Sequence, residues 1–463
     1  MAFDADSPSY LGGAVSLADH GSLARVPPHR GPGMAVLLWP FLYLPGQGSI
    51  WGVKIFFHVL GWACAGLAFC LARRLTASEA LAFGCALACA CLLDFTQFAS
   101  LLLSEVPAAF AALVFAWPLV AFTQTARPAH LYASLAALCF AVLLRPENVL
   151  LALGYVPAAG SLASCVKKGR KAFLIKALAV LLAALSPIVL WCWRNQARFG
   201  FFGLSNYGPV ILYEGFCNRG PNLGVDIADP NIPSMRYLLD TLDLMKQREL
   251  AAGHGWQKGP DFPGDVFFLW YCLNTVRGLS HAQVLEAFRH AAQDCMAARP
   301  GSCAWLAVKK VAFGMRLPSL LRYWTTPLPG EPPLNTVSSL RDYWEHRRPP
   351  YRFQNQEVIS APLVRFWRAA TSAYDAVARS RPFRAVWFFG LLGFVLCPLA
   401  RPRGPWAAFC IVAFFKAVFP VAVASGIPRN FVPGTFFYLI LTAGACQWAF
   451  RRARACRKPR AAR

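Results

Sequence analysis

The stretch "WGVKIFFHVLGWACAGLAFCLARR", residues 51–74, decides the fold. Its apolar run, 51–72, has the length that a helix needs to cross the hydrocarbon core of a bilayer, about 20 residues. Arg73 and Arg74 close the run, and basic residues beside an apolar run favour its cytoplasmic end. The stretch therefore predicts a transmembrane helix that ends in the cytoplasm.

The composition of the whole chain agrees with a membrane protein. Of its 463 residues, 57% are hydrophobic and 15% are charged, whereas a soluble domain carries about a quarter charged residues. The net charge of +24 would suggest nucleic acid in a soluble protein. Here the basic residues cluster between apolar runs and show no spacing typical of nucleic-acid recognition, so a nucleic-acid partner is excluded.

Apolar runs along the chain predict about nine membrane-spanning helices. The runs are 51–72, 79–93, 106–122, 129–144, 148–165, 172–193, 383–400, 405–425 and 432–450. The expected fold class is an all-α polytopic membrane protein with a large outer-face domain.

Basic clusters orient these helices. They are Arg73-Arg74, "KKGRK" at 167–171, Arg401 with Arg403, and the tail that begins at Arg451. If the spans simply alternate, all four clusters fall on one side, which the positive-inside rule makes the cytoplasm. The expected organisation is an outer first loop with an interfacial helix at 1–50, a transmembrane bundle at 51–193, an outer-face (periplasmic) domain at 194–382, transmembrane helices at 383–450 and a basic cytoplasmic tail at 451–463. An outer amino terminus also leads us to expect that the first transmembrane helix is missing from the recorded chain.

Acidic residues on the expected outer face are the first candidates for chemistry: Asp4, Asp6, Asp94 and Glu105. A carboxylate at the membrane is costly and is therefore a functional candidate. It could serve as a general base on a hydroxyl acceptor or as a metal ligand. The alternative is a helix cap or a solvated loop acid, and for Asp94 this alternative is favoured.

Arginines on the same face run against the positive-inside bias: Arg145, Arg194, Arg198 and Arg429. A phosphate ligand would explain them, because a guanidinium pairs with phosphate through two parallel hydrogen bonds. The alternatives are interfacial snorkelling, which is favoured for Arg198, and an ion pair with Glu147 in the case of Arg145.

The cysteines and histidines give weaker indications of disulfides and of metal binding. Of 16 cysteines, four lie in the long polar region, namely Cys217, Cys272, Cys295 and Cys303. An even number outside the cytoplasm permits disulfides; Cys295 with Cys303 is the first candidate pair and Cys217 with Cys272 the second. The histidines show no metal-ligand spacing, so the metal content stays unknown.

Six short motifs, taken in order, resemble a known family. They are "DSPSYLGGAVSLADHG" (6–21), "PPHRGPGMAVLLWPFLYLPG" (27–46), "LLLSE" (101–105), "LLRPENVLL" (143–151), "RNQARFGFFGLSNYG" (194–208) and "RNFVPGTFFYLIL" (429–441). The chain resembles the polytopic C-class (GT-C) glycosyltransferases, and within them the bacterial branch with protein mannosyltransferase-like and aminoarabinose transferase-like enzymes.

The resemblance implies transfer of a sugar from a polyprenyl-phosphate donor to a hydroxyl acceptor on the outer face, with inversion. The acceptor would be an envelope glycan, lipid or protein, and the enzyme would lie in the cell inner membrane with its active site facing the periplasm. By the same resemblance Asp6 matches the first-loop catalytic acid and Glu105 the second-loop acid. Arg429 matches the arginine near the donor phosphate, with Arg194 and Arg145 as further candidates for phosphate binding. No cofactor is certain, and a divalent metal ion is left open.

Two other classes stay open. A transporter or lipid flippase would also need many helices and intramembrane charges, but not an outer domain of roughly 190 residues, and it commonly shows internal repeats. A different outer-face transferase, such as a polysaccharide ligase, is the other alternative.

Overall fold

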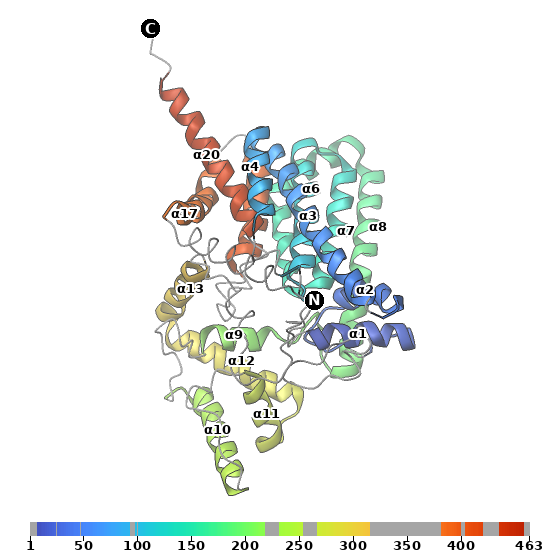
Figure 1. Cartoon of the computed structure of the whole chain (residues 1–463), viewed down its shortest axis with the longest axis vertical. Coiled ribbons are helices and arrows are strands. Elements are labelled where there is room, and N and C mark those ends of the chain that lie inside the picture. The colour runs from blue at the N-terminus through green and yellow to red at the C-terminus, as the bar shows by residue number, and fades with distance from the viewer. Residues whose placement is uncertain are drawn as a thin grey trace, which may run out of the picture.

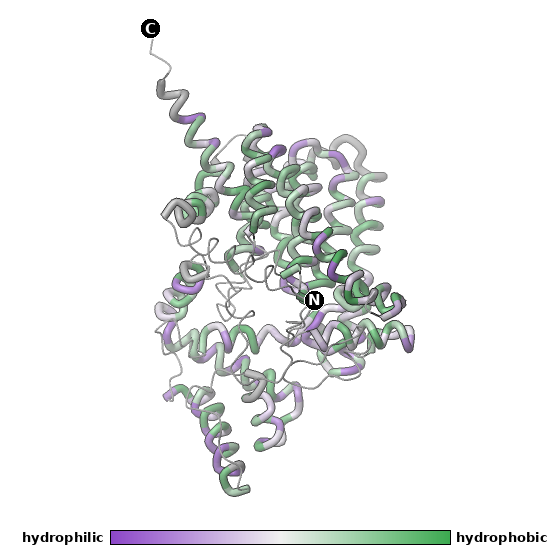
Figure 2. Tube along the Cα trace, in the orientation of Figure 1, coloured by the Kyte–Doolittle hydropathy of each residue, from purple (hydrophilic) through white to green (hydrophobic). Residues whose placement is uncertain are grey.

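The computed structural model describes residues 7–24, 26–46, 48–92, 98–99, 101–217, 231–252, 266–314, 381–399, 403–419 and 435–457. In these residues the chain is built from helices (Figure 1). They form a bundle of apolar helices and a second group of more polar helices beside one of its ends (Figures 1 and 2). The expected all-helical membrane fold is confirmed at this level.

Five helices form the first part of the bundle. They are α3 (Gly48–Thr76), α4 (Glu79–Ala90), α6 (Glu105–Thr125), α7 (Pro128–Leu144) and α8 (Ala159–Phe199). Tight turns join successive helices: Ala77 and Ala126 both adopt left-handed backbone angles, with φ of 51°. Such short connections make α3 and α4, and then α6 and α7, antiparallel neighbours.

The C-terminal helices complete the bundle. They are α17 (Arg381–Leu396), α18 (Arg403–Ala413), a π-helical turn η5 (Phe414–Val418) and α20 (Thr435–Arg457). Gly393 lies against the backbone of Leu441, so α17 approaches α20 closely. Buried aromatic side chains such as Phe115 and Phe409 fill the common core.

One end of the bundle collects the basic clusters. Arg74 Nε donates to Gln124 Oε1 at 2.5 Å, and Gln447 donates to the Thr76 carbonyl, so the carboxyl ends of α3 and α6 lie beside α20. Ser161 near the start of α8 donates to the Thr123 carbonyl at 3.2 Å. The Arg73-Arg74 pair and the basic end of α20 therefore share one end of the bundle.

Fewer helices than expected have the length and composition to span a membrane. In the described part of the chain, three helices are long and apolar enough to cross a membrane, at Gly48–Thr76, Glu105–Thr125 and Ile175–Phe199. Four shorter apolar helices accompany them. The nine expected spans are thus not confirmed, although a helix lies at each expected position.

The expected spans 148–165 and 172–193 are not separated by a break in the helical structure. Residues Pro146–Ala158 form a 3-10 helix, η2, and α8 then continues through "KKGRK" as one helical element to Phe199. Pro146 begins η2 and Pro157 lies inside it. Pro146 stands at the first position, where proline is tolerated, and Pro157 lacks the N–H that a regular helix would use at its position.

The first loop also contains helices. α1 (Ser7–His20), α2 (Gly33–Leu38) and a 3-10 turn η1 (Trp39–Tyr43) lie across the end of the bundle opposite the basic clusters (Figure 1). The first loop, 1–50, is expected to contain an interfacial helix, and Gly33–Tyr43 is a short apolar helical segment divided into α2 and η1. Its aromatic residues Trp39 and Tyr43 are exposed, as residues that anchor a helix at an interface would be.

The second group of helices has its own core. It consists of α9 (Gly208–Phe216), α10 (Pro233–Ala251), α11 (Val266–Arg277), α12 (His281–Ala298) and α13 (Pro300–Gly314). Tyr213 on α9 packs on Phe288 of α12, with ring centroids 5.0 Å apart. Its position in the chain matches the expected outer-face domain, whose placement outside the membrane stays a prediction.

The cysteines of this group are buried among its helices. Cys217 and Cys303 are free thiols, so the structure contains neither expected bridge. The Cys217 thiol instead donates to the Ala291 carbonyl at 3.4 Å, and the Cys303 thiol faces the Cys295 carbonyl at 4.0 Å. Spacing along the chain could not predict this arrangement because α9, α12 and α13 bring their cysteines together through packing.

Candidate functional site

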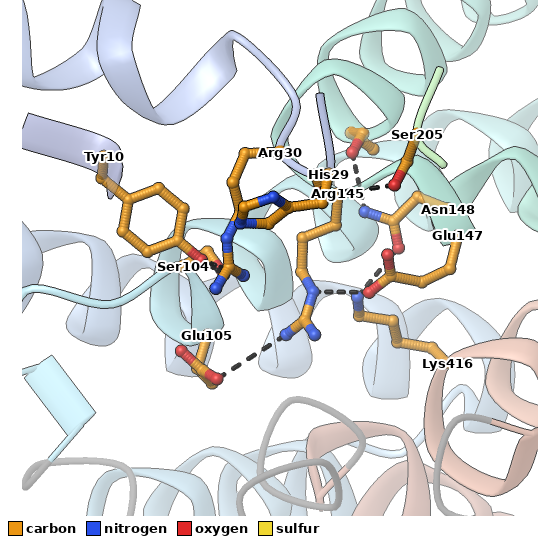
Figure 3. Close-up of polar contacts among 11 residues, drawn as sticks. Tyr10, His29, Arg30, Ser104, Glu105, Arg145, Glu147, Asn148, Ser205 and Lys416 are labelled. Carbon is orange, nitrogen blue, oxygen red and sulfur yellow. Dashed lines mark hydrogen bonds and ion pairs between the residues drawn. The ribbon is translucent and has the colours of Figure 1, made fainter. Parts of the chain in front are cut away.

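A buried ion pair joins two helices at the end of the bundle opposite the basic clusters. Glu105 is the first residue of α6 and is 3% exposed, and Arg145 follows the last residue of α7. Because the two helices are antiparallel, these ends meet, and Arg145 Nη1 lies 3.8 Å from Glu105 Oε1 (Figure 3). A carboxylate in the first turn of a helix also interacts favourably with the helix dipole.

Arg145 holds a second carboxylate. Its Nε lies 2.5 Å from Glu147 Oε1, and Pro146 between them turns the chain into η2. Burial raises the pKa of Glu147, but Arg145 and Lys416 lower it more, so this pKa lies below its ordinary value. Glu147 is therefore ionised at neutral pH and fixes the guanidinium between two carboxylates.

A lysine enters the same cluster from a distant helix. Lys416 lies in the π-helical turn η5, is 3% exposed, and donates from Nζ to Asn148 Oδ1 at 2.8 Å. Asn148 donates in turn to the Ala141 carbonyl at 2.7 Å, which orients its oxygen toward the lysine. Figure 3 shows Lys416, Glu147 and Arg145 as neighbours in one polar cluster.

The first loop supplies the other side of the cluster. Tyr10 on α1 donates to Ser104 Oγ at 3.1 Å, directly before Glu105. Arg30 donates to the Tyr10 hydroxyl at 3.1 Å, and its guanidinium lies 5.0 Å from the Tyr10 ring centroid. Ser7 at the start of α1 donates to the Leu102 carbonyl at 3.0 Å. The start of α1 is thus fastened to the segment that leads into α6.

Two glycines allow this loop to approach α7. A Cβ atom on Gly31 would lie 2.2 Å from the Leu143 carbonyl oxygen, and one on Gly33 would lie 2.8 Å from the Leu144 nitrogen. Contacts this short exclude any side chain at either position. The "RGPG" turn therefore rests on the backbone just before Arg145, which brings Arg30 and Arg145 to the same site.

Arg194 fastens the loop from the other side. Its Nη2 donates to the carbonyls of Leu23, Ala24 and Val26 at 3.2, 2.8 and 2.6 Å. The guanidinium also lies over the Trp191 ring, 4.4 Å from its centroid. Arg198, one turn later, donates to the Ala24 carbonyl at 2.8 Å. These contacts favour a structural clamp on Leu23, Ala24 and Val26, and phosphate binding by Arg194 stays a prediction.

The segment after α8 closes the site toward the second group of helices. Ser205 Oγ donates to the His29 carbonyl at 3.2 Å, and the His29 and Tyr207 rings lie 5.7 Å apart. Asn206 contacts the His281 ring at the start of α12. Burial lowers the pKa of His281, which keeps this ring neutral at neutral pH. The aromatic, glycine-rich stretch of the sequence therefore connects the first loop with the second core.

The structure brings together part of the predicted site. Glu105 and Arg145 meet, whereas Asp4, Asp6, Asp94 and Arg429 lie outside the described residues. Sequence reasoning missed four members of the cluster: Tyr10, Arg30, Asn148 and Lys416. Lys416 had a usable signal, because it is a charge inside the apolar run 405–425, and intramembrane charges mark functional sites.

The charges of the cluster do not balance. Among the described residues it contains the carboxylates of Glu105 and Glu147 against the cations of Arg30, Arg145 and Lys416 (Figure 3). The excess is positive, as a site for an anionic ligand requires. The described residues contain no group of three histidine, cysteine, aspartate or glutamate side chains that could hold a metal ion.

Comparison with known proteins gives one match. The family model described as dolichyl-phosphate-mannose-protein mannosyltransferase matches residues 29–191, about a third of the chain. Glu105 and Arg145 lie inside the matched range, whereas Asp6, Arg194 and Arg429 lie outside it. Searches of curated proteins and of solved structures found no match. The family match and the apolar helices together support a membrane glycosyltransferase of the GT-C type that uses a lipid-linked sugar.

Proposed function

We propose that the protein transfers a sugar from a polyprenyl-phosphate donor to a hydroxyl acceptor on the outer face of the membrane, with inversion at the anomeric carbon. The observation that carries this proposal is the buried pair of Glu105 and Arg145, which lies beside Arg30 and Lys416 at one end of the bundle. The family match to residues 29–191 supports the lipid-linked donor. We place the enzyme in the bacterial branch of the C-class glycosyltransferases.

The proposed orientation rests on the two ends of the bundle. The basic residues at the carboxyl ends of α3 and α20 favour the cytoplasm, and Glu105 lies at the other end of α6. This helix is roughly 30 Å long at 1.5 Å per residue, which matches the thickness of a hydrocarbon core. The site would then face the periplasm of the cell inner membrane, where an envelope glycan, lipid or protein would be the acceptor.

Asp6 is the proposed general base. It precedes Ser7 in the chain, and Ser7 is hydrogen-bonded to Leu102, close to the start of α6. The resemblance of the first-loop motif to the C-class enzymes supports this role for Asp6, with an acceptor hydroxyl bound near Glu105.

The proposed step is a single displacement. The acceptor oxygen attacks C1 of the sugar while Asp6 accepts the hydroxyl proton. The bond between C1 and the phosphate oxygen breaks, and its electron pair leaves with the polyprenyl phosphate. Arg429, with Arg145, would stabilise the charge that develops on that phosphate. Attack opposite the leaving group inverts the anomeric carbon, and the carboxylate of Glu105 would stabilise the oxocarbenium-like transition state.

Envelope glycans of the native cell provide the test. Deletion of the gene should remove one sugar from an envelope glycan, detected by mass spectrometry, and the full-length wild-type gene should restore it. Glu105→Gln and Asp6→Asn keep size and polarity but remove the charge. Each should lower transfer by roughly a hundredfold, the usual contribution of a general base or a matched charge.

Two matched variants serve as controls at equal protein level. Asp4→Asn changes an acid two positions before Asp6, and Glu79→Gln changes an exposed acid at the other end of the bundle, where it pairs with Arg73. Both should restore the sugar. A glycan profile unchanged by deletion, or full restoration by Glu105→Gln, would contradict the proposal.

A further inference from the structure

Lys416 is an unusual residue for an apolar helix. Its side chain is 3% exposed, and removing an ammonium group from water is costly unless a partner compensates it. Its hydrogen-bond partner, Asn148, is neutral. Among the described residues no ion pair within 4 Å joins Lys416 to a carboxylate. The carboxylates of Glu105 and Glu147 pair directly with Arg145 and act on Lys416 only through longer-range electrostatics.

The backbone around Lys416 is also unusual. Residues Phe414–Val418 form a π-helical turn at the end of α18. Such turns are rare and occur frequently at functional sites. Lys416 lies in the middle of this turn, and its side chain points into the polar cluster (Figure 3).

The packing of η2 on α18 holds Lys416 in place. A Cβ on Gly154 would lie 2.8 Å from Val412 Cγ2, so η2 approaches α18 closely at this point. Val412 is one helical turn before Lys416. The close approach therefore sets Lys416 against Asn148 at the start of η2, beside the Arg145 guanidinium.

We propose that Lys416 and Arg145 form a binding site for the phosphate group of the lipid-linked donor, with Lys416 as a phosphate-binding residue supplied by the π-helical turn. This rests on the proposed function. An ammonium group has three donors, and Asn148 accepts from it once. A phosphate oxygen would accept from the other donors and would provide the negative charge that Asn148 does not.

The position of Lys416 fits a lipid phosphate. It lies near the end of α18 that is remote from Arg403, and roughly 20 Å along the helix from that residue at 1.5 Å per position. A polyprenyl chain could then lie along the apolar helices while its phosphate reaches the polar cluster. Phosphate is shared by the donor lipid and by ordinary anionic phospholipids, so the test must separate the two.

Binding to the full chain in nanodiscs tests the site. With phosphatidylcholine as the bulk lipid and a polyprenyl monophosphate as the probe, native mass spectrometry gives the dissociation constant. Lys416→Met keeps the volume and removes the charge, and it should weaken binding by about tenfold to a hundredfold, as the loss of a charge-assisted hydrogen bond would. Lys416→Arg should stay within about threefold of wild type.

Lys54→Met is the matched control, since Lys54 lies in apolar α3 with its ammonium over the Trp51 ring. It should leave the dissociation constant unchanged. Lys416→Met leaves Asn148 Oδ1 without its donor, so some loss of stability is expected, and binding is measured at a temperature at which thermal unfolding shows that all variants are folded. An unchanged constant in Lys416→Met, or an equal loss in Lys416→Arg, would overturn the inference.

Two further comparisons distinguish the donor lipid from ordinary phospholipid, and the phosphate site from the proposed function. If phosphatidylglycerol binds the wild type as tightly as the polyprenyl monophosphate and competes with it, the site is a general lipid-phosphate site, and the donor assignment is wrong. If the wild type binds the probe and Lys416→Met weakens it while Glu105→Gln still restores the glycan, the proposed function fails and the phosphate site stands. If Lys416→Met binds normally while the glycan test succeeds, only the present inference fails.

Discussion

The Cα of Gly31 faces the carbonyl oxygen of Leu143 so closely that a Cβ atom would lie 2.2 Å from it. The atom in the way is backbone, so it cannot swing aside as a side chain could. Gly31→Ala should therefore push the first loop away from α7, lower the stability by about 1–3 kcal/mol and strongly reduce transfer. Thermal unfolding and the glycan assay measure these effects.

Gly66→Ala is the control for that change. Gly66 lies in α3 with open space around the position of a Cβ atom, and alanine is the better helix former by about 1 kcal/mol. It should leave activity and stability unchanged or slightly improved. Equal effects of the two variants would contradict the close approach of Gly31 to α7.

The Arg194 clamp predicts a local change in hydrogen exchange. Lysine at this position offers a point charge that cannot span three carbonyl groups as the planar guanidinium does. Arg194→Lys should raise the exchange of the amides of residues 22–26 on the order of tenfold, because the loop opens more often. Arg198 donates to one of those carbonyls from a more exposed position, so Arg198→Lys should have a smaller effect. Unchanged exchange in both variants would show that the clamp does not hold the loop.

Lys310 predicts a pH dependence in the second group of helices. Burial lowers the pKa of Lys310 from 10.5 to about 8, and its ammonium donates to the Gly215 carbonyl. Between these two values the unfolded state binds more protons than the folded state, so stability rises with pH across that window and is independent of this group below about 8. The slope is at most about 1.4 kcal/mol per pH unit.

Hydrogen exchange in α9 measures that slope on the full chain. Lys310→Met should flatten it between pH 8 and 10, whereas Lys309→Met, whose ammonium lies over the Trp305 ring at the surface, should leave it unchanged. A slope that persists in Lys310→Met would assign the titration to another group.

Topology is open to a direct test with reporter fusions. Fusions after residues 74, 170 and 403 should report the cytoplasm, and fusions near residues 210 and 428 should report the periplasm. The reason is that basic residues are retained on the cytoplasmic side during insertion. A cytoplasmic signal near residue 210 would reverse the proposed orientation of the site.

Much of the helix pattern could be predicted because it depends on local hydropathy. The expected spans 106–122 and 129–144 match α6 and α7 within a few residues, since the apolar runs end at polar or helix-breaking residues. The expected span 148–165 differs in its local form: it begins as a 3-10 helix that contains Pro157, and α8 begins at Ala159. The packing of this segment on α18, as at Gly154 beside Val412, is tertiary and could not be predicted from hydropathy.

The site was less predictable because its contacts are tertiary. Glu105 and Arg145 could be singled out one by one as charges at the ends of apolar runs, but their pairing depends on the antiparallel contact of α6 and α7. Lys416 lies 268 positions from its partner Asn148, and the π-helical turn that directs it has no marker in the sequence. Asp6 and Arg429 stay predictions, because they lie outside the described residues.

The hydrogen bonds from Arg194 to residues 23–26 also have a consequence for biosynthesis. They join parts of the chain 168 to 171 positions apart, so the ribosome must finish α8 before the first loop has its partner. Before that point the chain can already form the contacts of Tyr10 with Ser104 and of Arg30 with Tyr10. The transferase site is therefore assembled late during membrane insertion, and a nascent chain released within "KKGRK" would carry the Glu105–Arg145 pair beneath an unfastened loop.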